Sequence, residues 1–158
     1  MAADERMWRI GEVATATGLT VRALHHYDQI GLVAPSVRTS GGHRLYTSAD
    51  LVLLYDELDL PFGSLRVRPR GRSAGHNGVD SLIAALGTQE ITRVRMGVGP
   101  DHPVGDGARY VLSQFKKAQL AVVDQVLDEA AEAVKVILAD GVQAAMNRFN
   151  RKPEDASD

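Results

Sequence analysis

The sequence contains no cysteine, which excludes a disulfide framework and a zinc site built on thiolates. It also has no run of about 18 apolar residues of the kind that crosses a membrane. The acidic opening MAADERMWRIGEV lacks the apolar core of a secretory signal. We therefore expect a cytoplasmic protein without a membrane partner, and we predict no cofactor and no metal.

A global excess of basic residues is absent too, because the net charge is −2. Composition alone therefore does not indicate a nucleic-acid-binding protein. The charge is locally uneven, however: RVRPRGR places four arginines at alternate positions from 66 to 72, and no acidic residue lies between Asp59 and Asp80. The length of 158 residues suits one ordinary domain or two small ones.

The first part of the chain has the pattern of two short helices joined by a tight turn. IGEVATAT (10–17) is amphipathic, and Gly18 stands where a left-handed C-terminal cap is needed. Thr20 is a good N-cap for a second helix that ends at Gln29. Two extended runs around Ser40-Gly41-Gly42 then predict a hairpin-like wing. Together they predict a winged helix-turn-helix.

This region resembles the DNA-binding region of MerR-family regulators over about residues 8–54. The motifs that carry the resemblance are RIGEVA, TGLTVRALHHYDQIGL and GGHRLYTSADL, in that order. The resemblance implies that duplex DNA is the partner and that the second helix enters the major groove. It implies DNA contacts from Thr20, Arg22, His26, Tyr27, Arg38, Arg44 and Tyr46.

Two alternatives remain open for this module. Arg44 and Tyr46 could instead pin the wing to the helices, and His25 and His26 could be solvated or packed. The sequence also departs from the family around Leu51 to Tyr55, where the further helices and the dimerisation helix do not follow. This departure puts binding by a two-fold dimer in doubt.

The rest of the chain, about residues 52–150, resembles the C-terminal part of bacterial peptidyl-tRNA hydrolase. YDELDLPFG, GHNG, LIAALGTQ, RVRMGVGP and AAMNRFN follow in the family's order. The resemblance implies a mixed α/β sheet with flanking helices, and tRNA or peptidyl-tRNA as partner. It implies that Asp56 orients a catalytic histidine, that Asn77 lines the catalytic cleft, and that Arg66, Arg68 and Arg95 lie near tRNA phosphates.

The family's catalytic histidine belongs to a TRHN-like motif, and neither this motif nor the GLGNPG-like motif occurs in the sequence. The five histidines present match no catalytic position of the family. Because a general base typically supplies ~10²–10⁴-fold in rate, we expect hydrolysis to be lost or very weak. Structural roles remain open as well: Asp56 could cap a turn, Asn77 could hold its loop, and the arginines could form a solvated strand face.

The join between the two resemblances lies within residues 51–55. Thr47 to Asp50 resembles a capping box, and the spacing of Leu51, Leu54 and Leu58 fits a helix over 48–58. The apolar run LVLLY fits a buried strand equally well. Helix and strand both stay open here, as do a natural fusion, a designed chimera and a faulty gene model.

The predicted fold class is therefore α+β or α/β. We expect a winged helix-turn-helix over 1–54, a truncated hydrolase-like α/β domain over 55–150, and a disordered tail over 151–158. Within the second domain the pattern predicts a helix over 79–87, a strand over 92–99 and helical structure over 116–149 with a break at Asp140-Gly141.

We predict a two-module nucleic-acid-binding protein with a hydrolase-like domain of little or no activity. One alternative is a peptidyl-tRNA hydrolase that retains activity. Another is a dimeric transcription regulator that pairs through its C-terminal helix, although a helix packed on a sheet explains the same pattern. Self-association through an exposed sheet is also expected. The apolar series with coiled-coil-like spacing consists of Leu120, Val123, Leu127, Ala130, Val134 and Ile137.

Overall fold

The computed structural model describes residues 6–31, 33 and 35–150. Their contacts divide the chain into two compact units. Unit 1 combines the residues up to 52 with residues 70–91, and unit 2 combines residues 53–69 with residues 92 onward. The hydrolase-like sequence therefore contributes to both units, and each unit is described by itself.

Unit 1 contains the predicted pair of short helices, α1 (Ile10–Thr17) and α2 (Val21–Gln29). Gly18 ends α1 with a left-handed φ of 71°, a conformation that costs a residue with a Cβ more than it costs glycine. The hydroxyl oxygen of Thr20 accepts a hydrogen bond from the backbone N–H of Ala23 at 3.1 Å and so caps α2. Both helices and their caps agree with the prediction.

The two extended runs predicted as a wing are β2 and β3, which pair in a small antiparallel sheet with the strand order β1-β3-β2. These strands are β1 (Trp8–Arg9), β2 (Val37–Arg38) and β3 (Arg44–Tyr46). A 3-10 turn (Ser48–Asp50) follows, and Oδ2 of Asp50 accepts from the backbone N–H of Thr47 at 2.7 Å. The predicted capping box is therefore present.

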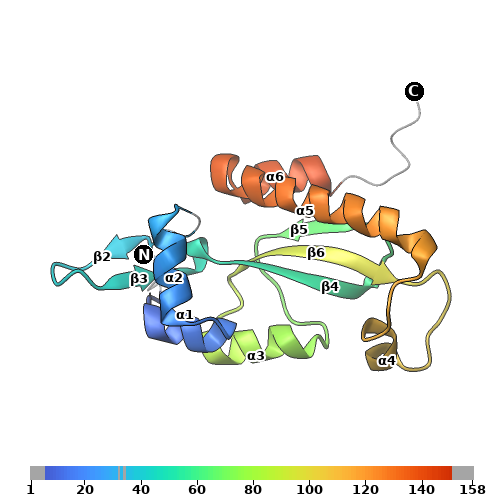
Figure 1. Ribbon diagram of the computed structural model, residues 1–158, viewed down its shortest axis with the longest axis horizontal. Helices are drawn as coiled ribbons and strands as arrows, with labels where there is room; N and C mark the ends of the chain where they lie inside the picture. The colour runs from blue at the N-terminus through green and yellow to red at the C-terminus, as the bar shows by residue number, and fades with distance from the viewer. Residues whose placement is uncertain (1–5, 32, 34, 151–158) are drawn as a thin grey trace. The chain divides into compact units, whose positions relative to one another are not determined.

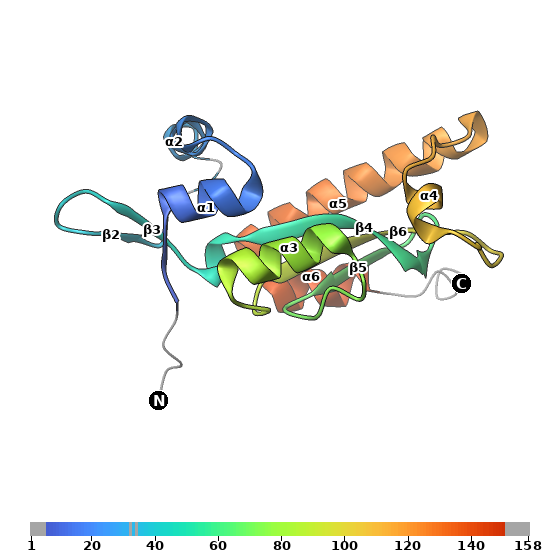
Figure 2. The ribbon, with the colours of Figure 1, turned by 90° about the horizontal axis from the view of Figure 1, so that it is seen from below.

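Helix α3 (Asn77–Leu86) completes unit 1 and lies beside α1, as Figure 2 shows. The indole Nε1 of Trp8 donates to the backbone oxygen of Leu86 at 3.1 Å. This core explains why residues 70–91 group with the N-terminal residues, whereas the sequence placed the domain boundary at residues 54 and 55. The most buried apolar side chains of unit 1 are Trp8, Val13, Leu24, Tyr46, Val79, Leu86 and Ile91.

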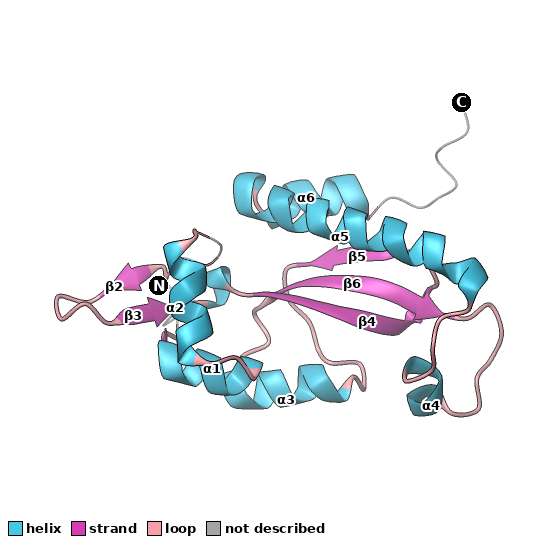
Figure 3. Ribbon diagram, in the orientation of Figure 1, coloured by secondary structure: helices cyan, strands magenta, loops and turns pink. Residues whose placement is uncertain are grey.

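Unit 2 is built on a sheet with the order β4-β6-β5. Its strands are β4 (Val52–Pro61), β5 (Leu65–Arg68) and β6 (Thr92–Gly99). β5 and β6 are antiparallel, whereas Figure 3 shows β4 and β6 running in the same direction, so the sheet is mixed. The segment that sequence left open as helix or strand is thus a strand from Val52, preceded by one 3-10 turn.

Three helices complete unit 2: α4 (Gly107–Val111), α5 (Leu120–Asp140) and α6 (Val142–Phe149). The predicted break occurs at Gly141, whose φ is 87°. Figure 1 shows α5 and α6 packed together alongside β5 and β6. No helix in the described ranges is long and apolar enough to cross a membrane. The predicted tail, 151–158, falls outside the described residues.

The buried face of α5 differs from the predicted coiled-coil-like series. Val126, Ala130 and Ala133 are buried, whereas Leu127 is 52% exposed. The helix packs small side chains against its own unit, and pairing of two chains through its exposed side, which includes Leu127, stays a prediction. The interpretation of this helix as one packed on a sheet is confirmed.

Candidate functional site

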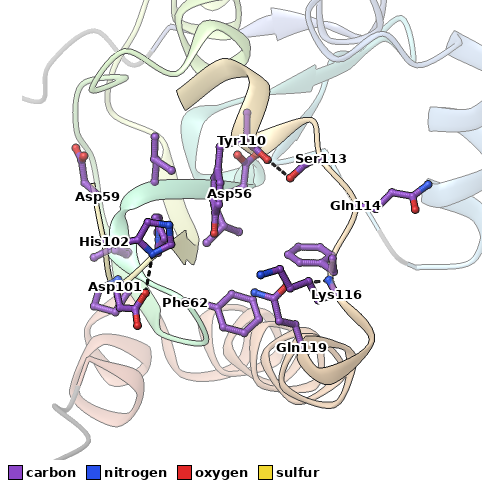
Figure 4. Close-up of a pocket in the computed structure, with 18 residues that line it drawn as sticks. Asp56, Asp59, Phe62, Asp101, His102, Tyr110, Ser113, Gln114, Lys116 and Gln119 are labelled. Atoms are coloured by element: carbon purple, nitrogen blue, oxygen red, sulfur yellow. Dashed lines mark hydrogen bonds and ion pairs between the residues drawn. The ribbon is translucent and has the colours of Figure 1, made fainter. Parts of the chain in front are cut away.

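A cleft of about 960 Å³ lies entirely within unit 2 (Figure 4). Its walls come from the second half of β4, the loop after β6, α4 and the segment before α5. No cluster of three or more His, Asp and Glu side chains that could hold a metal ion occurs in the part of the chain that is described. The ionisable and amide side chains that line the cleft are Asp56, Asp59, Asp101, His102, Tyr110, Gln114, Lys116 and Gln119.

Close backbone packing at Gly97 and Gly99 holds β6 against β4 beside this cleft. A Cβ at Gly97 would collide with the backbone oxygen of Pro61, and a Cβ at Gly99 would collide with that of Leu58. Only glycine allows the two strands to approach this closely. The strand that carries Asp56 is fixed by this packing, so the half-buried carboxylate occupies a defined place in the cleft.

The cleft has an apolar side and a polar side. The rings of Phe62 and Phe115 face each other with centroids 6.1 Å apart and an interplanar angle of 42°. The hydroxyl of Ser113 donates to the backbone oxygen of Tyr110 at 2.6 Å, which tightens the turn after α4. Such a mixture of aromatic and polar groups suits a ligand that has an apolar part and several hydrogen-bonding groups.

The only histidine among the cleft residues is His102. Its Nδ1 lies 2.9 Å from Oδ1 of Asp101, and this hydrogen bond is the main reason why the pKa of Asp101 lies below its usual value. When Nδ1 donates this bond, Nε2 remains available as a proton acceptor. The Asp101 side chain is 99% exposed and that of His102 is 70% exposed, so water screens the pair.

The two predicted catalytic residues lie in different units. Asp56 is on β4 in unit 2, and Asn77 is the exposed first residue of α3 in unit 1. Next to Asn77, Nδ1 of His76 accepts from the backbone N–H of Val79 at 3.3 Å, which makes His76 the N-cap of α3. The catalytic roles of Asp56 and Asn77 stay predictions.

The three arginines predicted to contact tRNA differ in their surroundings. Arg68 is exposed at the end of β5. Arg66 donates to the backbone oxygen of Asn150 at 2.6 Å. Arg95 donates twice to Oε2 of the buried Glu57, and only 21% of its side chain is exposed. Arg66 and Arg95 therefore hold unit 2 together, and Arg68 presents the most accessible charge of the three.

Most of the predicted DNA contacts lie on the surface of unit 1. Thr20, Arg22 and His26 are exposed, and Tyr27 is half-buried with its ring centroid 6.2 Å from that of His26. On the wing, Arg38 is exposed and Arg44 is half-buried, and both form ion pairs with Asp28 of α2.

Tyr46 does not fit the predicted contact. Its side chain is fully buried, so it offers no atom to a phosphate. The register that pairs Tyr46 with Trp8 across β1 and β3 explains this burial, because both aromatic side chains belong to the core of unit 1. Tyr46 therefore follows the alternative in which it pins the wing.

Sequence reasoning missed several residues that organise these sites. Asp28 and Glu57 each hold an arginine that was predicted to bind nucleic acid. No local signal marked this pairing, because each carboxylate lies in a different motif from its arginine: Asp28 and Arg44 belong to separate motifs, and so do Glu57 and Arg95. Asn150 and His102 gave no local signal, because their roles depend on segments that meet only in the fold.

Comparison with known proteins identifies the larger part of the chain. The family model for peptidyl-tRNA hydrolase matches residues 34–157. The chain belongs to the peptidyl-tRNA hydrolase family. A second model, MerR family regulatory protein, matches the shorter stretch 9–46. The two matches overlap. They are consistent with the predicted combination of a MerR-like segment and a peptidyl-tRNA hydrolase segment in one chain.

The peptidyl-tRNA hydrolase of Koribacter versatilis is 65% identical over 105 residues, which cover 66% of this chain and 52% of that protein. The enzyme of Solibacter usitatus is 48% identical over 104 residues, with 66% and 53% covered. The chain thus spans about half the length of the relatives that it matches. A crystal structure of the Acinetobacter baumannii peptidyl-tRNA hydrolase is also similar, with a TM-score of 0.56, 25% identity, and coverage of 82% of this chain and 59% of that one.

Proposed function

We propose that this member of the peptidyl-tRNA hydrolase family is a two-module nucleic-acid-binding protein. Its helix-turn-helix binds duplex DNA, and its hydrolase-like part binds tRNA with hydrolysis lost or very weak. The observation that carries the proposal is the arrangement of α2 and the wing: Arg22 and His26 are exposed on α2, and the exposed Arg38 of the wing is paired with Asp28 of the same helix. The match of residues 9–46 to a regulator family supports it.

The second helix supplies the base-reading part of this surface. Arg22 and His26 lie one turn apart on α2 and are both exposed, so they can reach a major groove together. Arg38 on the wing is 51% exposed and can reach a neighbouring phosphate. A single module of this size buries only about 600–1,000 Å² against DNA, so we expect weak and strongly salt-dependent binding.

The hydrolase-like part keeps the cleft but not the family's histidine motif. The family resemblance gives Asp56 the role of orienting a histidine base, and a carboxylate in that role does not itself activate water. The exposed Arg68 provides a point at which a tRNA phosphate can bind. We therefore expect this part to bind tRNA more readily than it hydrolyses peptidyl-tRNA.

A salt titration of the full chain against labelled duplex DNA and against tRNA tests both halves. We expect Arg22→Ala to reduce binding to duplex and leave tRNA binding unchanged, and Arg68→Ala to do the reverse. Arg148→Ala on α6 is the matched control for the loss of one exposed positive charge. Equal effects of all three variants on both ligands would show that binding reflects charge alone and would refute the proposal.

One observation favours a second candidate function, peptidyl-tRNA hydrolysis that is retained. Asp56 and His102 line the same cleft, and Asp101 orients the His102 ring. In this scheme Nε2 of His102 accepts a proton from water, the hydroxide adds to the ester carbonyl, and the bond to the ribose oxygen breaks. That oxygen leaves with the proton that His102 returns, so no metal or cofactor is needed.

Release of peptide from peptidyl-tRNA by the purified chain distinguishes the two candidates. If hydrolysis is retained, turnover should fall strongly in His102→Ala and in Asp56→Ala but not in the control His43→Ala, which removes an exposed histidine of the wing. Absence of turnover in the unaltered chain would eliminate the second candidate and leave the first.

A further inference from the structure

Asp28 joins the recognition helix to the wing through two arginines. Its Oδ1 and Oδ2 accept from Nη2 of Arg38 at 2.9 and 2.7 Å, and Oδ2 also accepts from Nε of Arg44 at 2.6 Å. The Asp28 side chain is only 9% exposed, and the side chains of Arg44 and Arg38 are 23% and 51% exposed. The carboxylate is therefore enclosed, while part of Arg38 faces solvent.

The register of the wing explains why a carboxylate is needed here. Arg38 on β2 lies directly opposite Arg44 on β3. Like charges at directly opposed positions of an antiparallel pair destabilise it. One shared carboxylate reverses this effect, because each arginine gains a charge-assisted hydrogen bond to the same group. The three side chains together keep a net charge of +1.

We propose that Asp28 is a positioning residue for DNA binding, which fixes the wing against α2 so that helix and wing meet the duplex as one preformed surface. This inference rests on the proposed DNA-binding function. It assigns to a half-buried acidic residue a favourable effect on binding to a polyanion. The negative charge of Asp28 by itself repels DNA phosphates, so removing this charge strengthens binding when nothing else changes. The positioning role predicts the opposite, that removing Asp28 weakens binding.

The opposite signs make the variant Asp28→Asn decisive. If Asp28 positions the wing, the variant binds duplex DNA roughly tenfold more weakly than the unaltered chain at the same salt concentration. If Asp28 acts only through its charge, the variant binds more tightly. Asp80→Asn, an exposed position on α3 of the same unit, controls for the loss of one negative charge and should not weaken binding.

A double-mutant cycle shows whether Asp28 acts through Arg38. In the positioning scheme Arg38→Gln weakens binding, and adding Asp28→Asn to this variant causes little further loss. If the double variant weakens binding by the product of the two single fold-changes, the two residues act independently, and this outcome would overturn the proposal. Arg38→Lys keeps the charge but loses the planar guanidinium whose Nη2 donates to both oxygens of Asp28, so it should also weaken binding and serves if Asp28→Asn does not fold.

Hydrogen exchange without DNA separates this inference from the function on which it rests. We expect faster exchange of the backbone amides of residues 37–46 in Asp28→Asn and Arg38→Lys than in the unaltered chain. Unchanged exchange there would refute the positioning role even if the protein binds DNA. If the variants exchange faster but the unaltered chain binds no duplex DNA, the proposed function is refuted, while the role of Asp28 in ordering the wing is established.

Discussion

Tyr46 lies on β3 opposite Trp8, and its hydroxyl is buried with no hydrogen-bond partner among the described residues. Burial raises the pKa of this hydroxyl, and the charge of Asp28 raises it further, so the group stays neutral. A buried hydroxyl without a partner loses its hydration and gains nothing in return. The aromatic ring of Tyr46 stabilises unit 1, whereas its oxygen does not.

Tyr46→Phe should therefore increase the free energy of unfolding by about 1 kcal/mol. The ring keeps its packing while the unsatisfied oxygen disappears. Thermal denaturation of both proteins measures the difference. DNA binding should not change, because the Tyr46 side chain is not accessible. A variant that is less stable or binds DNA more weakly would show that the hydroxyl has a partner or a contact that burial conceals.

The charge of Asp28 predicts a specific dependence of stability on pH. Hydrogen bonds from Arg44 and then Arg38 hold the pKa of Asp28 below its ordinary value of 3.8. A group whose pKa is lowered by folding contributes stability above its unfolded pKa, and this contribution is lost as the pH falls through its folded pKa. Asp28→Asn removes the contribution at every pH.

We therefore expect the difference in melting temperature between the unaltered chain and Asp28→Asn to be constant from pH 7 to about pH 5. Below 3.8 the difference should shrink as the carboxyl is protonated. Melting curves recorded over this range measure it. A difference that persists unchanged at the lowest pH would mean that the ion pairs do not account for the role of Asp28.

At the level of helices and strands, Asn150 closes one edge of the sheet in unit 2. Its Oδ1 accepts from the backbone N–H of Val67 at 2.8 Å, and its Nδ2 donates to the backbone oxygen of Val67 at 2.9 Å. The amide thus makes the two hydrogen bonds that a further strand would make to β5. Edge strands with free backbone groups pair readily with other chains, so this contact protects the edge.

Asn150→Ala should lower the free energy of unfolding by about 1–3 kcal/mol and increase self-association, because it leaves both backbone groups of Val67 without these partners. Thermal denaturation and sedimentation measure the two effects. Asn150→Asp is the matched control, because it keeps an oxygen acceptor for the Val67 N–H and loses the Nδ2 donor. Its free energy of unfolding should therefore differ from that of Asn150→Ala. No loss in either variant would show that water replaces the amide fully.

The elements that sequence predicted correctly are those whose signals are local. Caps at Thr20 and Gly18, the alternation over 92–99 and the break at Gly141 each depend on neighbouring residues. β4 was ambiguous because an apolar run fits a helix and a buried strand equally, and its place beside β6 in the sheet decides between them.

The candidate sites were less predictable, because their groups come from distant segments. Asn150 contacts β5 across 83 residues, and His102 and Asp56 line a cleft whose walls come from segments far apart in the sequence. No periodicity in the sequence encodes such contacts. The family resemblance assigned Asp56 a catalytic role that stays a prediction, and it gave no information on Asp28, since pairing across the wing depends on one register.

Considered as a whole, the molecule does not divide where its two resemblances meet. The chain passes between the two units at residues 52, 69 and 91, so no single cut separates them. The core of unit 1 contains side chains from both resemblances: Trp8 belongs to the N-terminal part, whereas Val79, Leu86 and Ile91 belong to the hydrolase-like part. The unit that contains α1 and α2 therefore depends on residues 70–91 for part of its core.

Trp8 makes this dependence measurable, since it is the single tryptophan of the chain and is 1% exposed. A fragment of residues 1–54 keeps Trp8 but lacks the oxygen of Leu86 and the apolar side chains of α3. We expect the full chain to show the emission of a buried indole that resists acrylamide quenching. The fragment should show red-shifted emission close to that of the full chain unfolded in urea. Removing several buried apolar groups should cost more free energy than the whole folding stability of so small a module, so the fragment should be unfolded.

The contrary result has an equally definite meaning. A fragment with blue-shifted emission and a cooperative melt would show that residues 1–54 fold alone and that the domain boundary expected from the sequence is correct. Trp8→Phe in the full chain separates the two parts of the contact, since phenylalanine keeps most of the apolar packing and loses the hydrogen bond to Leu86. If the shared core holds unit 1 together, this variant should melt at a lower temperature but still fold, whereas the fragment should not fold.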